Sequence, residues 1–346
     1  MNAALPSVSV VGAGRMGEGI ALAFIHAGLP VTLIDIKERA EDERRAYFER
    51  VQNNVRGELQ MLVRLGVLLP DQADTAMSRL TLQARSRAAA TLSECDLVFE
   101  AVPEVIAVKQ ETFAWVSEHV PASTIIASTT STFLVTELSG MVSEPKRFVN
   151  AHWLNPAYLM PLVEVSRSET TCPHVVERLL QLLKRIGKVA VVCNPVAGYI
   201  VPRIQALAMN EAARMVEEGV ASAEDIDTAV RVGFGLRFSV LGLLEFIDWG
   251  GGDILYYASR YLSGALAPRF ESPQVIADNM QNGRNGLRDG QGFYDYRDMD
   301  VDAYKQQRLG DFVRKLELSG LTPAFEGALK QPESLGPEGP SGSSTR

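Results

Sequence analysis

Short apolar runs alternate with amphipathic stretches along the first half of the chain. Residues 7–11 (SVSVV) and 30–35 (PVTLID) are apolar runs typical of buried strands. Residues 18–26 between them have helical apolar spacing, which ends before Gly28. A strand, a helix and a second strand in this order indicate a parallel sheet, and the right-handed crossover rule places the helix over one of its faces.

The alternation resumes after a polar interruption. Residues 38–78 have a mostly helical pattern, rich in Arg and Glu and broken at Gly66 and Pro70, which predicts a helical hairpin inserted after the second strand. Two later helices are expected at residues 107–119 and 173–186. The remaining strands are expected at residues 96–101, 124–128, 148–151, 162–165 and 189–192.

These elements predict an α/β fold with two domains. Residues 1–193 would form a Rossmann-type domain around a mostly parallel sheet, and residues 194–320 an all-helical domain. In the second domain, apolar residues recur with helical spacing over residues 200–216, and the pattern ends at Gly219, as in a long amphipathic helix. Residues 321–346, whose last part is rich in Pro, Gly and Ser, are expected to be disordered.

Composition then narrows the class of protein. The 346 residues are enough for two domains, and 46% hydrophobic and 22% charged residues are ordinary for a globular protein. The net charge of −8 argues against non-specific binding to nucleic acid or membranes, and no apolar stretch is long enough to span a bilayer. Because the first predicted strand begins at Ser7, we expect no signal or transit peptide and a cytoplasmic protein.

The cysteines point away from a metal centre. Cys95, Cys172 and Cys193 lie far apart in the sequence, and none belongs to a C-x-x-C pair. Zinc sites and redox dithiols usually show such pairs, so we expect no bound metal and no dithiol chemistry. Three buried thiols in a reducing compartment are the simpler interpretation.

A glycine-rich turn, Gly12-Ala-Gly14-Arg15-Met16-Gly17, follows the first predicted strand. Gly12 permits a tight turn, Gly14 lets the backbone approach a pyrophosphate, and Gly17 lets the helix pack closely on the strand. The free N–H groups of the helix N-terminus, with Arg15 and Met16, complete the predicted cofactor loop. A glycine turn without a ligand has the same composition, but a strand before it and a helix after it favour a dinucleotide.

Asp35 ends the second predicted strand, where the adenosine ribose of a dinucleotide is expected. A carboxylate at this position accepts hydrogen bonds from the ribose hydroxyls and repels a 2′-phosphate, so the predicted cofactor is NAD rather than NADP. Lys37 and Arg39 lie close by and weaken this preference. FAD shares the glycine fingerprint, but the chain is short for a flavoenzyme and lacks a second nucleotide motif.

His152 and Glu164 are the candidates for proton transfer. Oxidation of an alcohol by NAD needs a base for the hydroxyl proton, and histidine suits this role near neutral pH. His152 closes a predicted strand, where ligands bind in open α/β sheets. Glu164 interrupts an apolar run, and its burial without a partner would be costly, so a pair across a short hairpin is plausible. A core histidine and a solvent-edge glutamate explain the same residues equally well.

Several ordered motifs over residues 7–316 resemble the 3-hydroxyacyl-CoA dehydrogenase family, which also contains L-gulonate 3-dehydrogenase and carnitine dehydrogenase. The motifs are VVGAGRMGEGIA, FEAVPEVIAVK, ASTTST, AHWLNPAYLMPLVEV, VAGYIVPRI and NGLRDGQGFYDY. The resemblance implies a homodimer built through the helical domain. It also implies that His152 is the general base, that Glu164 orients it, and that Ser131 hydrogen-bonds the reacting oxygen beside the nicotinamide. It extends the cofactor site to Ala101, Val102, Glu104, Lys109, Ser131 and Asn155.

One position departs from the family pattern. Where the family has an asparagine in its F-I-V-N-R-like segment, this chain has Pro202, which has no N–H to offer a substrate carbonyl. Substrate polarisation would then come from elsewhere, or the substrate differs. Arg203 and Arg237 are candidates to bind a free substrate carboxylate.

Three functions therefore stay open. The first is NAD-dependent oxidation of a short 3-hydroxyacyl-CoA, such as 3-hydroxybutyryl-CoA, to its 3-oxo product. The second uses a free β-hydroxy acid or related carboxylated alcohol instead, and the third is a dinucleotide-binding protein with little catalysis. CoA phosphates need basic residues, but the arginines of the predicted hairpin alternate with acidic residues, which is more typical of a solvated helix face.

Overall fold

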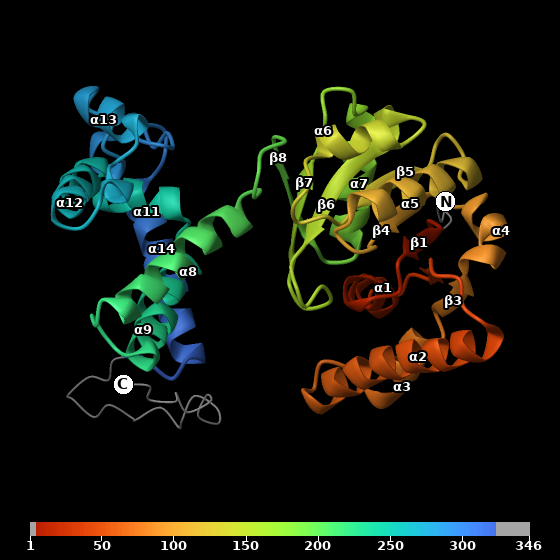
Figure 1. The fold of residues 1–346 in the computed structure, drawn as a ribbon. Helices are drawn as coiled ribbons and strands as arrows, with labels where there is room; N and C mark the ends of the chain where they lie inside the picture. The colour runs from red at the N-terminus through yellow and green to blue at the C-terminus, as the bar shows by residue number, and fades with distance from the viewer. Residues whose placement is uncertain (1–4, 323–346) are drawn as a thin grey trace. The chain divides into compact units, whose positions relative to one another are not determined.

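The computed structural model of the protein describes residues 5–322 (Figure 1). The chain divides into two compact units, residues 1–208 and 209–346, which we describe separately. The predicted disorder of residues 323–346 lies outside the described residues. Among the described helices, none combines the length and the apolar character that crossing a membrane requires.

The first unit is built on one eight-stranded sheet with the order β3-β2-β1-β4-β5-β6-β7-β8. All neighbouring strands are parallel except the antiparallel pair of β6 and β7. This sheet confirms the predicted α/β, mostly parallel fold class. The strands are β1 (Val8–Val11), β2 (Val31–Asp35), β3 (Leu80–Ala84), β4 (Leu97–Glu100), β5 (Ile125–Ser128), β6 (Phe148–Trp153), β7 (Leu162–Ser166) and β8 (Val189–Cys193).

Helices cover both faces of this sheet. Because side chains alternate along a strand, Val8 and Val10 join one hydrophobic cluster, with α1, α2, α3 and α7, while Val11 joins another, with α4, α5 and α6. The helices are α1 (Arg15–His26), α2 (Glu41–Arg64), α3 (Pro70–Met77), α4 (Ala89–Leu92), α5 (Ile106–His119), α6 (Val135–Leu138) and α7 (Pro173–Arg185). Short 3-10 turns lie at Arg85–Arg87, Ser139–Met141 and Pro145–Arg147.

The predicted hairpin is present as α2 and α3, which pack on α1. The edge strand β3, which follows this hairpin, was not predicted. Leu80 and Leu82 point to the apolar side of β3, but the strand is short and only partly buried, so its pattern is weak. The strand order reverses between β1 and β4, and a ligand crevice is expected at the carboxyl ends of the strands there.

Helices form the regular elements of the second unit in its described part, with isolated β-bridges joining Gly286 to Gln291 and Gln291 to Asp295. It begins within α8 (Val201–Glu217), and the Ser222 hydroxyl accepts a hydrogen bond from the Asp225 amide at the start of the next helix. Asp248 is buried and accepts hydrogen bonds from the amides of Phe293 and Tyr294. The remaining helices are α9 (Ala223–Ala229), α10 (Leu236–Phe238), α11 (Leu243–Gly250), α12 (Gly252–Ala265), α13 (Gln274–Gln281) and α14 (Val301–Leu318), with a π-helical segment at Val230–Gly235 and 3-10 turns at Pro268–Phe270 and Leu287–Asp289.

Candidate active site

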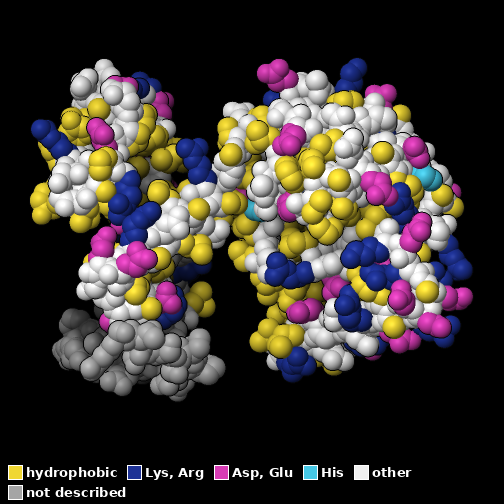
Figure 2. Space-filling view, viewed as in Figure 1, with side chains coloured by type: hydrophobic (Ala, Val, Ile, Leu, Met, Phe, Trp, Pro, Cys, Tyr) yellow, Lys and Arg dark blue, Asp and Glu magenta, His cyan; other side chains and the backbone are white. Residues whose placement is uncertain are grey.

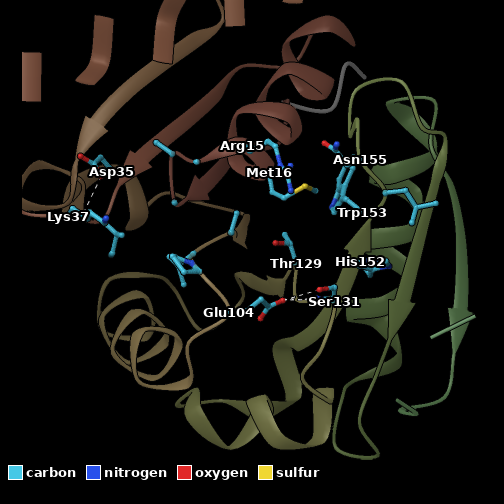
Figure 3. A pocket seen from close by; sticks show the side chains of 18 of the residues that line it. Arg15, Met16, Asp35, Lys37, Glu104, Thr129, Ser131, His152, Trp153 and Asn155 are labelled. Atoms are coloured by element: carbon cyan, nitrogen blue, oxygen red, sulfur yellow. Dashed lines mark hydrogen bonds between the residues drawn. The ribbon is translucent and has the colours of Figure 1, made fainter. Parts of the chain in front are cut away.

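A cavity of about 900 Å³ lies where β1, β2, β4, β5 and β6 end, entirely within the first unit. The glycine turn forms one wall of it. Figure 3 shows Asp35 and Lys37 at one end of the cavity and Glu104, Ser131 and His152 at the other. The fold thus brings the predicted cofactor loop and the predicted catalytic residues to one place.

The glycine turn has the backbone that a dinucleotide requires. Gly12 has a φ of +111°, and a Cβ there would lie 2.6 Å from the carbonyl oxygen of Ala101. A Cβ at Gly17 would lie 1.9 Å from the carbonyl oxygen of Gly12, so only glycine permits this close packing. Beside Gly14 there is open space, and no side chain caps the N-terminus of α1. The first-turn N–H groups are therefore available to a pyrophosphate, and these residues fit the predicted cofactor.

Asp35 lines one end of the cavity, and its carboxylate already has protein partners. Its Oδ2 accepts a hydrogen bond of 2.7 Å from Arg39 Nε, and its Oδ1 accepts one of 3.3 Å from the amide of Lys37. The Arg39 guanidinium also lies over the Tyr47 ring, 3.9 Å from its centroid. The Tyr47 hydroxyl donates to the carbonyl oxygen of Ala13 in the glycine turn, 2.7 Å away.

Tyr47 and Arg50 line this end of the cavity, and neither was predicted as a residue of the cofactor site. Both come from α2, and the Arg50 guanidinium also lies over the Tyr47 ring, at 4.5 Å. Their place depends on how the inserted hairpin folds back over the glycine turn, for which the local pattern carries no signal. Burial raises the pKa of the Tyr47 hydroxyl, and the nearby Asp35 carboxylate raises it further.

Lys109 requires a correction to the predicted cofactor site. Ala101, Val102 and Glu104 line the cavity, but Lys109 is buried behind them. Its ammonium group donates to both carboxylate oxygens of the buried Glu100, at 2.8 and 3.0 Å, and lies 3.4 Å from Glu104. A fully buried carboxylate needs a counter-charge, which explains why the lysine turns inward. Lys109 therefore supports the wall of the cavity instead of lining it.

The Ser131 loop is held by Glu104. One oxygen of Glu104 accepts a hydrogen bond of 2.7 Å from the amide of Ser131, and the other accepts one of 3.0 Å from the hydroxyl of Thr130. Ser131 itself is exposed and lines the cavity. Its hydroxyl has only two long contacts, each of 3.5 Å, with the same Glu104 oxygen and with the Thr132 hydroxyl. A bound molecule that accepts a hydrogen bond from Ser131 would replace the contact with Glu104.

His152 and Glu164 face each other across the antiparallel β6–β7 pair. The Nδ1 atom of His152 lies 2.9 Å from Oε2 of the fully buried Glu164. The other carboxylate oxygen accepts hydrogen bonds from the amides of Ile200 and Val201, at 2.9 and 2.8 Å. An ionised carboxylate only accepts hydrogen bonds, so at this position it favours the imidazole tautomer with its proton on Nδ1. Nε2 is then the basic nitrogen, on a ring that lines the cavity.

Only some of the remaining predicted site residues line the cavity. Asn155 and Pro202 line the cavity, as does Gln205, which the sequence analysis did not identify. Arg203 is exposed on α8 and does not line the cavity, so it is not placed to bind a substrate there. Arg237 belongs to the second unit, where its guanidinium lies 4.7 Å from the centroid of the Phe246 ring.

No group of three or more His, Cys, Asp or Glu side chains within residues 5–322 is arranged to hold a metal ion. The three cysteines are free thiols: Cys95 is buried, whereas Cys172 is exposed and Cys193 is half-buried. The expectation that all three are buried is therefore wrong for two of them.

Two models of one protein family match the chain in succession, up to residue 296. The NAD binding domain of 3-hydroxyacyl-CoA dehydrogenase matches residues 7–196, and the C-terminal domain of the same family matches residues 198–296. The chain belongs to the 3-hydroxyacyl-CoA dehydrogenase family. It is therefore an NAD-dependent oxidoreductase acting on CH–OH groups, and the alternative of a binding protein with little catalysis is not supported.

Relatives with different substrates resemble the chain to a similar degree. It is 30% identical to 5-formyl-3-hydroxy-2-methylpyridine 4-carboxylate 5-dehydrogenase of Mesorhizobium japonicum, over 89% of this chain and 96% of the relative. It is 31% identical to the mitochondrial hydroxyacyl-coenzyme A dehydrogenase of Sus scrofa, over 84% and 91%. Among solved structures, the 3-hydroxyacyl-CoA dehydrogenase of Archaeoglobus fulgidus matches with a TM-score of 0.71 and 30% identity, over 91% of this chain and 99% of that one.

We predict that Asp35→Ala weakens the preference for NAD over NADP. The substitution removes the predicted ribose acceptor and frees the Arg39 guanidinium to meet a 2′-phosphate. The KM for NAD should rise roughly tenfold, as expected for the loss of a hydrogen bond to a charged group, and the KM for NADP should fall. Steady-state kinetics with each cofactor measure both changes.

The double variant Asp35→Ala with Arg39→Ala is the control. Its KM for NADP should not show the fall expected for Asp35→Ala, while its KM for NAD should stay raised. An Asp35→Ala variant with an unchanged KM for NAD would contradict the assignment of Asp35 as the ribose anchor.

Proposed function

We propose that this protein oxidises the 3-hydroxyl of a short 3-hydroxyacyl-CoA to the 3-oxo product. The observation that carries the proposal is the His152–Glu164 pair, which faces the same cavity as Ser131 and the glycine turn. A basic nitrogen held by a buried carboxylate is an arrangement suited to general-base catalysis. The family and its many acyl-CoA relatives, among them a probable 3-hydroxybutyryl-CoA dehydrogenase of Bacillus subtilis, support the choice of substrate.

The residues divide the chemistry as follows. Nε2 of His152 takes the hydroxyl proton, and Glu164 stabilises the imidazolium that forms. The Ser131 hydroxyl donates a hydrogen bond to the substrate oxygen as it becomes a carbonyl oxygen. Bound NAD supplies the acceptor for the hydride that leaves the substrate carbon.

The cofactor would be held along the whole cavity. The first-turn amides of α1 would bind its pyrophosphate, Asp35 its adenosine ribose, and Glu104 and Asn155 would lie at the nicotinamide end. Arg15 and Met16 line the cavity beside the glycine turn. Within residues 5–322, no hydrogen bond or ion pair engages the Arg15 guanidinium, which leaves it available to a phosphate.

A second candidate substrate is a free carboxylated alcohol, and Pro202 is the observation that favours it. Pro202 lines the cavity and has no N–H to polarise a thioester carbonyl. The Mesorhizobium relative is named for a pyridine carboxylate and not for a CoA thioester. Arg203 does not line the cavity, so it is not placed to bind the carboxylate of such a substrate there.

The surface of the hairpin also favours a smaller substrate. A second cavity of about 730 Å³ lies between α1, α2 and the loop after β6, and it adjoins the first at Gly14 and Arg15. Arg15 and Arg50 share it with Glu18 and Glu58, so its charge is mixed. Figure 2 shows basic and acidic side chains interspersed over the hairpin. CoA carries several phosphate groups, and a groove of mixed charge attracts them less than a basic one.

We predict that a panel of substrates separates the two candidates. NADH formation is followed with 3-hydroxyacyl-CoAs of increasing chain length and with the matching free 3-hydroxy acids. Turnover of short acyl-CoAs, with kcat/KM at least roughly tenfold above that of the free acids, is the expected result. Turnover of free acids alone would overturn the CoA assignment and leave the second candidate.

The variant His152→Gln tests the proposed base on whichever substrate is used. It should lower kcat by roughly 100-fold or more, since general-base catalysis contributes on that scale. His174→Gln, at an exposed histidine outside the cavity, is the matched control and should keep full activity. A fully active His152→Gln variant would remove the proposed base.

We also propose that the protein is a homodimer joined through the helical unit, as the family resemblance implies. Ile254, Tyr257 and Tyr261 are 61%, 61% and 73% exposed on α12. They are spaced three and four residues apart, so they share one helix face. An exposed apolar stripe of this kind is typical of a subunit interface.

The free thiols are consistent with a reducing compartment, and we propose that the protein is located in the cytoplasm.

We predict that the wild-type protein elutes as a dimer and that Tyr257→Asp with Tyr261→Asp yields a monomer. Two carboxylates would lose their hydration in an apolar interface, which opposes association. Size-exclusion chromatography with light scattering measures the mass. The control is Tyr294→Asp, at an exposed tyrosine outside this stripe, which should remain dimeric. A monomeric wild-type protein would contradict the proposal.

A further inference from the structure

Tyr199 lies in the segment between β8 and α8, next to the proposed base. It has a φ of +45° and is the one non-glycine residue with a positive φ among residues 5–322. Residues other than glycine rarely adopt this backbone conformation, and such strain persists only where the surrounding structure imposes it. Its side chain is 6% exposed. The contacts of the Tyr199 side chain therefore indicate why the strained backbone conformation is present.

The ring of Tyr199 stacks on the imidazole of His152. The two ring centroids are 4.9 Å apart, and the planes differ by 16°. The Glu164 carboxylate holds the edge of the imidazole at Nδ1 but does not by itself fix the plane of the ring. The phenol covers one face of the imidazole and supplies this second constraint. Edge and face together fix the orientation of a ring that lines the cavity.

The hydroxyl of Tyr199 reaches the loop that carries Ser131. It donates a hydrogen bond of 2.9 Å to the carbonyl oxygen of Thr130, the residue before Ser131. It accepts one of 3.1 Å from Nδ2 of Asn150, which also donates to the carbonyl oxygen of Phe133 at 3.0 Å. The same side chain thus contacts His152 with its ring and the Ser131 loop with its hydroxyl.

The backbone beside Tyr199 is fixed by the carboxylate that orients the base. The amides of Ile200 and Val201 both donate to Oε1 of Glu164, whose Oε2 faces His152. The tyrosine therefore cannot shift along the chain without breaking hydrogen bonds to Glu164. This arrangement imposes the strained φ of Tyr199 and seats its ring on the imidazole.

We propose that Tyr199 is a positioning residue for the reaction: it fixes the plane of the His152 ring and sets its separation from Ser131. The inference rests on the proposed roles of His152 and Ser131. A base and a hydrogen-bond donor must meet the same substrate oxygen, so their separation decides how well both act at once. Tyr199 is the side chain that contacts both parts of the site.

Two substitutions separate the ring from the hydroxyl. Tyr199→Phe keeps the stacking and loses the link to Thr130, so kcat should fall roughly fivefold, the scale of one hydrogen bond. Tyr199→Leu loses both constraints, and kcat should fall by roughly 100-fold, the scale of a misplaced catalytic group. The KM for NAD should change little in either variant, because the cofactor loop is untouched. Partial rescue by phenylalanine is the signature of positioning by the ring.

Tyr296→Phe is the matched control. Tyr296 is a buried tyrosine of the second unit whose hydroxyl donates to Asp248 at 3.1 Å, so this variant also loses one buried hydrogen bond. Its kcat should equal that of the wild type. Thermal unfolding of all variants shows whether a loss of activity reflects a loss of fold.

Proton NMR of the full chain gives a readout that needs no turnover. The chain has four histidines, so the Nδ1 proton of His152 is assigned by its disappearance in His152→Gln. A downfield Nδ1 proton should be present in the wild type and in Tyr199→Phe. It should broaden or vanish in Tyr199→Leu, because the unstacked ring rotates away from Glu164.

The inference is overturned if Tyr199→Leu keeps both its Nδ1 proton and the kcat of Tyr296→Phe. It is also overturned if the loss of activity in Tyr199→Leu follows its KM for NAD or its unfolding temperature, since that result indicates a structural role only. A fully active His152→Gln variant would instead refute the proposed base, so the two failures are distinguishable.

Discussion

The buried carboxylate of Glu164 is the constraint on which the site depends. A carboxylate without solvent costs of the order of several kcal/mol unless hydrogen bonds replace its hydration. Glu164 meets this demand by dividing its oxygens, one toward His152 and one toward the amides of Ile200 and Val201. Strand β6, strand β7 and the start of α8 must therefore meet at one point. The placement of the base and the position of residues 200–201 beside β7 are consequences of the same interaction.

A second buried acid organises the opposite wall of the cavity in the same way. Glu100 is fully buried at the end of β4 and is paired with Lys109, while Glu104 holds the amide of Ser131. Each wall thus contains a buried glutamate whose hydrogen bonds come from other protein groups instead of water. Tyr199 connects the two walls, because its ring lies on His152 and its hydroxyl contacts Thr130. Rigid positioning of this kind lets a site act on a bound alcohol without reorganising.

The sequence predicted what local patterns encode. The strands and the glycine turn follow from apolar runs and from glycines at fixed spacing, and the His152–Glu164 contact follows from a hairpin between two short strands. The edge strand β3 was missed because its burial is incomplete. The prediction that Lys109 lines the cofactor site differs from the structure because its partner, Glu100, lies within an apolar strand and was not recognised as a buried charge. Tyr47 and Tyr199 were missed as site residues because their roles depend on contacts between distant segments.

The most direct test of this account is a double-mutant cycle on His152 and Glu164, read as kcat/KM for the substrate that the enzyme turns over. The cycle compares His152→Gln, Glu164→Gln and the double variant with the wild type. If Glu164 acts by holding the base, the double variant loses no more activity than His152→Gln alone, because the carboxylate has no function once the imidazole is gone. Losses that multiply in the double variant would show that the two residues act independently and would contradict the account.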